Sequence, residues 1–119
     1  EQIVVKGDGS AIRSYLAGED MAQWLISMML NGRAGEAYNV GSDQPVAMLQ
    51  LAERMRDLLA PNKEIIIENR SGLNSHRSIY LPSIAKAADL GLRPEITLSE
   101  MITNTAIGLQ SMHTLQKNA

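Results

Sequence analysis

The sequence predicts one mixed α/β domain over residues 1–119, with three to four helices and short strands. Two β-branched runs, Ile3 to Val5 and Ile65 to Ile67, are typical of strands. Elsewhere apolar residues recur every three to four positions, which is the period of an amphipathic helix. Strands that alternate with such helices favour a mixed α/β or α+β fold.

The first residues predict a β-hairpin. Gln2 to Lys6 is the first strand, and Ala11 to Leu16 alternates apolar with polar side chains as the second. The residues between them, Gly7 to Ser10, favour a turn because glycine tolerates positive φ. Arg13 is the one cation inside the second strand.

Two helices are expected in the first half of the chain. One begins at Glu19 and ends at Gly32, and its acidic start suits the positive end of the helix dipole. The other runs from about Met48 until Pro61 stops it.

A strand is predicted next to each of these helices. Ala37 to Val40 is a short apolar segment before Gly41, which is the pattern of a buried strand that enters a loop. Glu64 to Glu68 is built on three isoleucines. The polar, aperiodic stretch from Asn69 to Ser78 is the main predicted loop.

The last third of the chain predicts two more helices. Ser83 is a candidate N-cap for a short helix through Leu90. Thr97 and Glu100 form a capping box, in which each side chain bonds the free backbone donor of the other, and this opens the last helix. Its inward face should carry Met101, Ile102, Thr105, Ala106, Leu109 and Met112.

The composition argues against several classes of function. A net charge of −2 with no basic stripe and few aromatic residues excludes a typical nucleic-acid partner. The absence of cysteine excludes disulfides and thiolate chemistry. With no membrane-length apolar run and no signal-peptide pattern, we expect a cytoplasmic protein. The start at Glu1 followed by a β-branched run indicates a piece of a longer chain.

Two arginines are the candidate anion ligands. Arg13 lies within a predicted strand, and Arg70 follows the isoleucine strand at the mouth of the main loop. A guanidinium suits phosphate because its planar fork makes paired charge-assisted hydrogen bonds. The alternative is that both are ordinary exposed arginines. His76 lacks the nucleophile, carboxylate and second ligand that a catalytic or metal site needs, so neither site is expected.

Three blocks of the sequence together resemble the C-terminal part of the NAD-dependent sugar-nucleotide epimerase/dehydratase family, the extended short-chain dehydrogenases. The blocks stand in the family's order and near its spacing, and the resemblance covers essentially all 119 residues. They read GDGSAIRSYLAGEDMAQWL, GEAYNVGSDQPVAMLQLAERM and RSIYLPSIAKAADLGLRPEITLSEMI.

The resemblance implies a substrate-binding role for five residues. In the family, the arginine at the place of Arg13 binds the diphosphate of the nucleotide-sugar, and an aromatic residue matched by Tyr15 lies at the same site. Asn39 belongs to a strand that joins the Rossmann sheet and ends near the nucleotide. Arg70 corresponds to a second diphosphate contact, and Tyr80 to a tyrosine on the substrate side.

Two departures limit the resemblance. Ser71 replaces the proline that usually follows the second arginine, and the longer loop makes Arg77 a competitor for that role. The cofactor half is absent, because neither a Gly-rich dinucleotide turn nor a Tyr-x-x-x-Lys pair is present. NAD or NADP is implied for a complete family member, but we expect no cofactor site and no catalytic residue in this chain.

The resemblance therefore predicts a nucleotide-sugar binding domain for UDP-, dTDP- or CDP-linked sugars, without the reaction centre. The alternatives are a stand-alone, non-catalytic ligand-binding or oligomerising protein descended from that domain, and a structural module whose pocket has lapsed. Residues Ala37 to Val40 carry no charge and no proline to protect an open sheet edge. We accordingly expect a homo-oligomer that forms through this edge.

Overall fold

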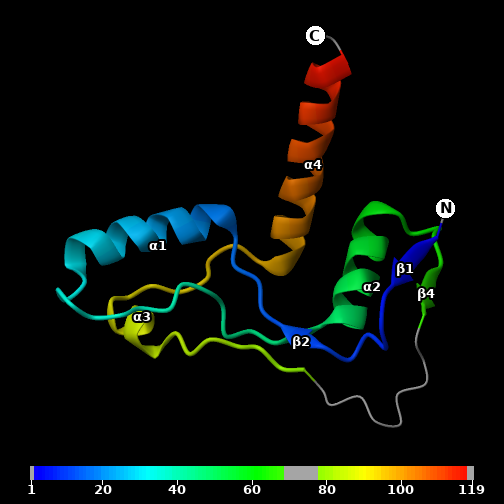
Figure 1. Ribbon diagram of the computed structural model, residues 1–119. Coiled ribbons are helices and arrows are strands. Elements are labelled where there is room, and N and C mark those ends of the chain that lie inside the picture. Colours follow the sequence, from blue (N-terminus) through cyan, green and yellow to red (C-terminus); the bar gives the residue numbers. More distant parts are fainter. Residues whose placement is uncertain (1, 69–77, 118–119) are drawn as a thin grey trace.

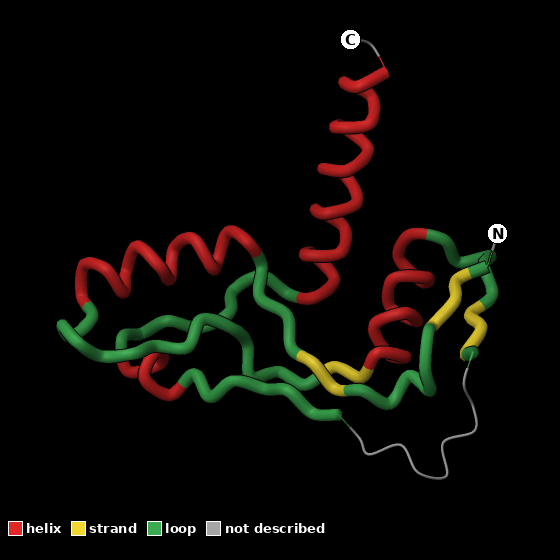
Figure 2. Tube along the Cα trace, viewed as in Figure 1, coloured by secondary structure: helices red, strands yellow, loops and turns green. Residues whose placement is uncertain are grey.

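The computed structural model describes residues 2–68 and 78–117, which form a flat, open arrangement (Figure 1). The radius of gyration is 17.6 Å, whereas a compact domain of this length has a radius of about 13.5 Å. Four helices and four short strands occur in the described part, and long loops connect them (Figure 2). The predicted mixed α/β class is confirmed.

A parallel pair of strands forms one end of the molecule. β1 (Ile3–Val5) lies beside β4 (Ile65–Ile67) with Val4 opposite Ile66, which confirms the isoleucine strand. α2 (Met48–Leu59) packs against this pair, as Figure 1 shows, and ends before Pro61 as predicted. Val5 is buried, whereas Val4 is 49% exposed because successive side chains of a strand point to opposite faces.

The predicted hairpin is wrong. β2 (Ile12–Arg13) pairs antiparallel with β3 (Val46–Ala47), and none of its bonds goes to β1. A tight hairpin turn needs positive φ at its first central residue, or at two adjacent ones. Here Gly7 and Gly9 take φ of +90° and +75° with Asp8 between them, which makes a wider loop.

The carbonyls of this loop cap α2 instead of closing a hairpin. The backbone oxygens of Gly9 and Ala11 accept hydrogen bonds from the amides of Leu49 and Met48 at 3.0 and 2.9 Å. A Cβ at position 9 would lie 3.0 Å from the Cβ of Leu49, so the close approach requires glycine. The loop thus satisfies free donors of the helix start and separates β1 from β2.

A second centre of packing lies around α1 (Gly18–Asn31), which ends at Gly32 as predicted. Trp24 is only 2% exposed and clusters with Ile84 and Ala87 at α3 (Ala85–Asp89). The N-cap of α3 is Ile84 and not the predicted Ser83, and no side chain caps this helix. The other face of α1 has exposed apolar side chains, namely Met21, Leu25, Ile26, Met29 and Leu30.

Residues Ala37 to Val40 do not form the predicted buried strand. They have no backbone partner among the described residues, and Ala37 and Asn39 are exposed. A strand needs a neighbouring strand for its backbone groups, and in the described part none lies beside this segment. Val40 still packs against the Trp24 cluster.

α4 (Leu98–Lys117) projects away from the other elements, as Figure 1 shows. The capping box is confirmed: the Glu100 carboxylate accepts the Thr97 amide at 2.8 Å, and the Thr97 hydroxyl accepts the Glu100 amide at 3.3 Å. The predicted inward face is wrong beyond the first turns, because Ile102 is buried but Leu109 and Met112 are 62% and 60% exposed. In the described part of the chain, no helix has both the length and the apolar character to cross a membrane.

Candidate functional site

Arg13 joins β2 to the segment that begins at Ser78. Its Nη1 donates to the backbone oxygens of Ile12 and Ser78 at 2.7 and 2.9 Å, and its Nη2 donates to the Ser78 hydroxyl at 3.0 Å. The side chain is half-buried at this junction. Its position is therefore set by contacts 65 residues away in the sequence.

These contacts leave part of the guanidinium free to bind a ligand. A guanidinium has five N–H donors, and the three bonds to Ile12 and Ser78 use both hydrogens on Nη1 and one on Nη2. The Nε–H and the second Nη2–H have no partner among the described residues. Two adjacent N–H groups of this kind form a fork for one phosphate or carboxylate.

Tyr80 lies beside Arg13 because the backbone of residues 78–80 runs along β2. Ile12 forms a parallel bridge with Ile79, and its carbonyl accepts the Tyr80 amide at 3.1 Å. The Tyr80 side chain is 74% exposed. The structure thus brings together two of the five expected binding residues, Arg13 and Tyr80, which are far apart in the sequence.

Asn39 belongs to a neighbouring junction. Its Nδ2 donates to the Ser83 backbone oxygen at 2.9 Å. A Cβ on Gly41 would lie 2.9 Å from the Cγ of Pro82, so the two segments are in close contact only because residue 41 is glycine. Residues 38–42 and 80–84 are therefore side by side, and both lead toward β2 (Figures 1 and 2).

The other two expected binding residues are not placed at a contact. Tyr15 follows β2 and is half-buried, with no polar partner for its hydroxyl among the described residues. Arg70 lies outside the described residues, as do His76 and Arg77, so the structure does not test their expected roles.

Sequence reasoning missed the structural role of Asp20. This carboxylate is 3% exposed, and its Oδ2 accepts the backbone amides of Glu95 and Ile96, each at 3.1 Å. The first turn of α1 is thereby fixed to the segment before α4. In the sequence, an acidic residue at a helix start indicates only a favourable interaction with the helix dipole. The hydrogen-bond partner of Asp20 lies 75 residues away, so no local pattern could predict it.

A polar hollow of about 290 Å³ lies at the other end of α1 and α3, lined by Arg33, Glu36, Tyr38, Lys86, Asp89 and Leu90. Lys86 forms an ion pair with Glu36, and its Nζ lies 6.0 Å from the centre of the Tyr38 ring. The hydrogen bond from Lys86 and its charge hold the pKa of Glu36 below the ordinary value. None of the five expected binding residues lines this hollow.

Neither the family's phosphate-binding turn nor a grouped set of metal ligands occurs among the described residues. The turn at Gly7 and Gly9 leads into β2 and not into a helix, so no helix N-terminus is available there for a pyrophosphate. Among residues 2–68 and 78–117, no three His, Cys, Asp or Glu side chains are grouped to hold a metal.

No family model matches the chain. Among curated proteins, the low-salt glycan biosynthesis protein Agl12 of Haloferax volcanii is 31% identical over 97 residues, covering 80% of this chain and 30% of that protein. A dTDP-glucose 4,6-dehydratase of Haemophilus influenzae is 30% identical over 114 residues, covering 85% of this chain and 33% of that protein. The chain belongs to the NAD-dependent epimerase/dehydratase family. It spans about a third of the length of these relatives.

Solved structures, a UDP-glucose 4-epimerase among them, share the fold of this chain. RMD from Pseudomonas aeruginosa, complexed with NADPH, matches with a TM-score of 0.72 and 25% identity, over 85% of this chain and 33% of that one. UDP-glucose 4-epimerase from Thermotoga maritima, solved with UDP-glucose, matches with a TM-score of 0.77 and 22% identity. This match covers 94% of the chain and 36% of the epimerase. The chain has the fold of a part of these enzymes.

Proposed function

We propose that the chain is the substrate-binding, C-terminal part of a sugar-nucleotide epimerase or dehydratase, and that Arg13 binds the diphosphate of the substrate. The observation that carries the proposal is the guanidinium of Arg13, held at the junction of two segments with two donors left over. Two of the similar proteins are named for dTDP-glucose and UDP-glucose, which both contain a diphosphate.

In this proposal, Arg13 supplies a positive charge and a fixed pair of donors for the diphosphate. Because Ser78 and Ile12 fix one side of the guanidinium, little side-chain entropy remains to be lost when the free side binds a phosphate. Tyr80 offers an exposed ring and hydroxyl on the adjacent segment, and Asn39 and Tyr15 would complete the polar wall. Arg70 would supply the second cation.

The chain would bind a nucleotide-sugar and not transform it. The sequence has neither the Gly-rich dinucleotide turn nor the Tyr-x-x-x-Lys pair of the family, so in this proposal the hydride chemistry of a complete enzyme takes place at residues outside this chain.

Calorimetry with UDP-, dTDP- and CDP-sugars tests the proposal. We expect weak binding of at least one of them, and a loss of about tenfold in affinity, or ~1.4 kcal/mol, in Arg13→Ala. Arg13→Lys keeps the charge but not the fork and should recover only part of the loss. Arg93→Ala removes an exposed arginine on another segment and serves as the matched control. Equal heats for Arg13→Ala and Arg93→Ala would refute the role of Arg13.

We also propose that the chain self-associates. The support is the segment 37–40, which has no backbone–backbone hydrogen bond among the described residues, together with the exposed apolar face of α1, where Met29 is 76% and Leu30 71% exposed. Apolar patches of this kind usually mark an interface. Sedimentation over a wide concentration range should show species larger than a monomer, and a monomer throughout that range counts against this proposal.

A further inference from the structure

The three acceptors that hold the guanidinium of Arg13 are all neutral. Nη1 donates to the backbone oxygens of Ile12 and Ser78, and Nη2 donates to the Ser78 hydroxyl. Neither of the two ion pairs among the described residues includes Arg13. The side chain is thus held in place while no described acid compensates its positive charge.

The backbone supplies two of these contacts, and the side chain of residue 78 supplies the third. The Ser78 carbonyl also accepts the Ile12 amide at 2.8 Å, and the Ile12 carbonyl accepts the Tyr80 amide at 3.1 Å. Nη1 of Arg13 therefore lies where two neighbouring segments already bond to each other, and its contacts need no particular side chain at position 78. Only the bond from Nη2, at 3.0 Å, depends on the hydroxyl.

This hydroxyl decides which N–H groups face a ligand. In the planar guanidinium, Nη1 and Nη2 form one edge, and Nε and Nη2 form the next. Ser78 occupies the first edge of Arg13 with its carbonyl and its hydroxyl, which leaves the second edge for an anion. Without the hydroxyl, the group is attached through Nη1 alone and can turn about it. A ligand would then have to fix the plane again, at a cost in entropy.

The neutrality of the hydroxyl matters as much as its position. A carboxylate at position 78 would accept the same N–H of Arg13, but it would also compensate the charge and repel a diphosphate. A hydroxyl accepts the hydrogen bond and leaves the charge to the ligand. Serine therefore combines a fixed guanidinium with an available charge.

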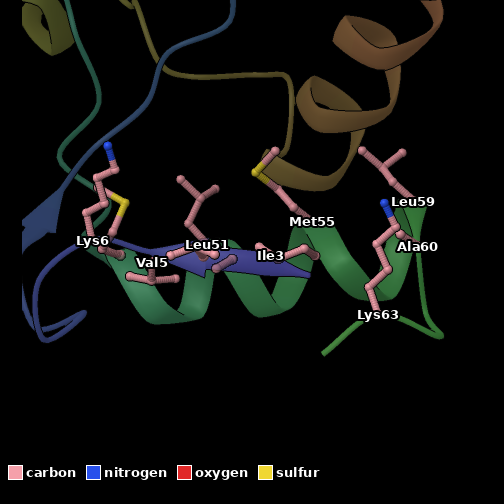
Figure 3. A pocket seen from close by; sticks show the side chains of 11 residues that line it. Ile3, Val5, Lys6, Leu51, Met55, Leu59, Ala60 and Lys63 are labelled. Atoms are coloured by element: carbon pink, nitrogen blue, oxygen red, sulfur yellow. The ribbon is translucent and has the colours of Figure 1, made fainter. Parts of the chain in front are cut away.

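The largest hollow of the described structure is a poorer place for a diphosphate. It encloses about 550 Å³ between β1 and α2, and its lining is almost entirely apolar. Figure 3 shows Leu51 and Met55 of α2 in this lining, with Lys6 and Lys63 as its only cations. Apolar side chains offer no donors to replace the water that an anion loses on binding. The junction at Arg13 offers both donors and charge.

We propose that Ser78 is the positioning residue of the diphosphate site, because its hydroxyl fixes the plane of the Arg13 guanidinium without compensating the charge. Ser78 does not touch the ligand in this arrangement and acts through Arg13. This role rests on the proposed function, since it requires that Arg13 binds the diphosphate of a nucleotide-sugar.

Calorimetry at low ionic strength tests this role, with whichever UDP-, dTDP- or CDP-sugar the native chain binds most tightly. Ser78→Ala should bind this sugar about three- to tenfold more weakly, because the guanidinium is no longer fixed. Ser78→Thr keeps a hydroxyl and should restore most of the affinity. Ser83→Ala is the matched control: it removes an exposed hydroxyl from the same segment, and that hydroxyl has no partner among the described residues.

A double-mutant cycle separates positioning from a merely structural role. If Ser78 acts through Arg13, Arg13→Ala/Ser78→Ala should bind no more weakly than Arg13→Ala alone. A hydroxyl that only stabilised the segment would weaken binding by the same factor with and without the guanidinium. Equal losses in the two backgrounds therefore overturn the proposal.

Ser78→Asn and Ser78→Asp isolate the effect of charge, because the two side chains have nearly the same shape. Asn offers a neutral oxygen to Nη2 of Arg13 and should bind the sugar within about threefold of the native chain. Asp should bind at least tenfold more weakly than Asn, and the difference should shrink at high salt because exposed charges are screened. Equal affinities of these two variants refute the proposal even if Ser78→Ala does not fold.

The variants also distinguish this role from the function on which it rests. If Arg13→Ala binds as tightly as the native chain, the proposed function fails and the role of Ser78 fails with it. If Arg13→Ala loses affinity while Ser78→Ala binds like Ser83→Ala, Arg13 remains the diphosphate ligand and only the role of Ser78 is refuted.

Discussion

Asp20→Ala should destabilise the fold more than any other single change at a helix start. The carboxylate is 3% exposed and accepts the amides of Glu95 and Ile96, so its loss leaves two donors without their acceptor. A hydrogen bond to a charged group contributes about 1.5–3 kcal/mol. Because both bonds are only partly buried, water can replace some of this contribution, and we expect a total loss of about 2–4 kcal/mol.

Urea unfolding followed by the fluorescence of Trp24 measures this loss. Trp24 is the only tryptophan, is 2% exposed, and lies one turn after Asp20 in the same helix. Asp20→Asn keeps an oxygen acceptor and loses the charge, so we expect it to lose about half as much stability. If Asp20→Ala does not fold, the stability of Asp20→Asn tests the prediction instead.

Glu19→Ala is the matched control, because Glu19 is an exposed acid in the same first turn. It removes the same charge near the helix dipole and should cost less than about 0.5 kcal/mol. If Asp20→Ala costs no more than Glu19→Ala, the connection to residues 95 and 96 carries no stability and the reasoning fails.

Two further predictions concern the other helix contacts. Thr97→Ala removes the hydroxyl half of the capping box and should lower the stability of α4 by about 1 kcal/mol. Thermal unfolding followed by circular dichroism measures this loss, and the exposed Thr103→Ala is the control. Equal losses in the two variants would contradict the prediction. Lys86→Ala should raise the pKa of Glu36 toward its ordinary value in an NMR titration, because Lys86 lowers that pKa now. Since the folded pKa is the lower one, the contribution of this pair is present above the unfolded pKa of about 4.3 and is lost as the pH falls through the folded value. If the pKa of Glu36 is the same in Lys86→Ala as in the native chain, the ion pair does not form in solution.

Local signals in the sequence predicted the helices well. The Thr97 and Glu100 box, the stop at Pro61 and the end at Gly32 all depend on residues within one or two turns of each other, so the sequence contains the complete interaction. The isoleucine strand was equally clear because β-branched residues favour extended backbone wherever they find a partner.

Tertiary structure decided every pairing between distant segments. The turn glycines predict a change of direction but not where the chain goes next, and β1 therefore pairs with a strand about sixty residues away. Apolar periodicity on α4 predicts which residues share a face, but only a neighbouring surface can bury them, and in the described part none covers Leu109.

The same division holds for the candidate site. The sequence by itself determined the family resemblance, the chemistry available at Arg13 and the absence of the family's cofactor and catalytic motifs. Only the tertiary structure decided that Ser78 occupies one side of that guanidinium, that Tyr80 lies beside it, and that the carboxylate of Asp20 is buried. The reason is physical: an arginine can pair with whichever acceptor the fold brings near it, and that acceptor is 65 residues away.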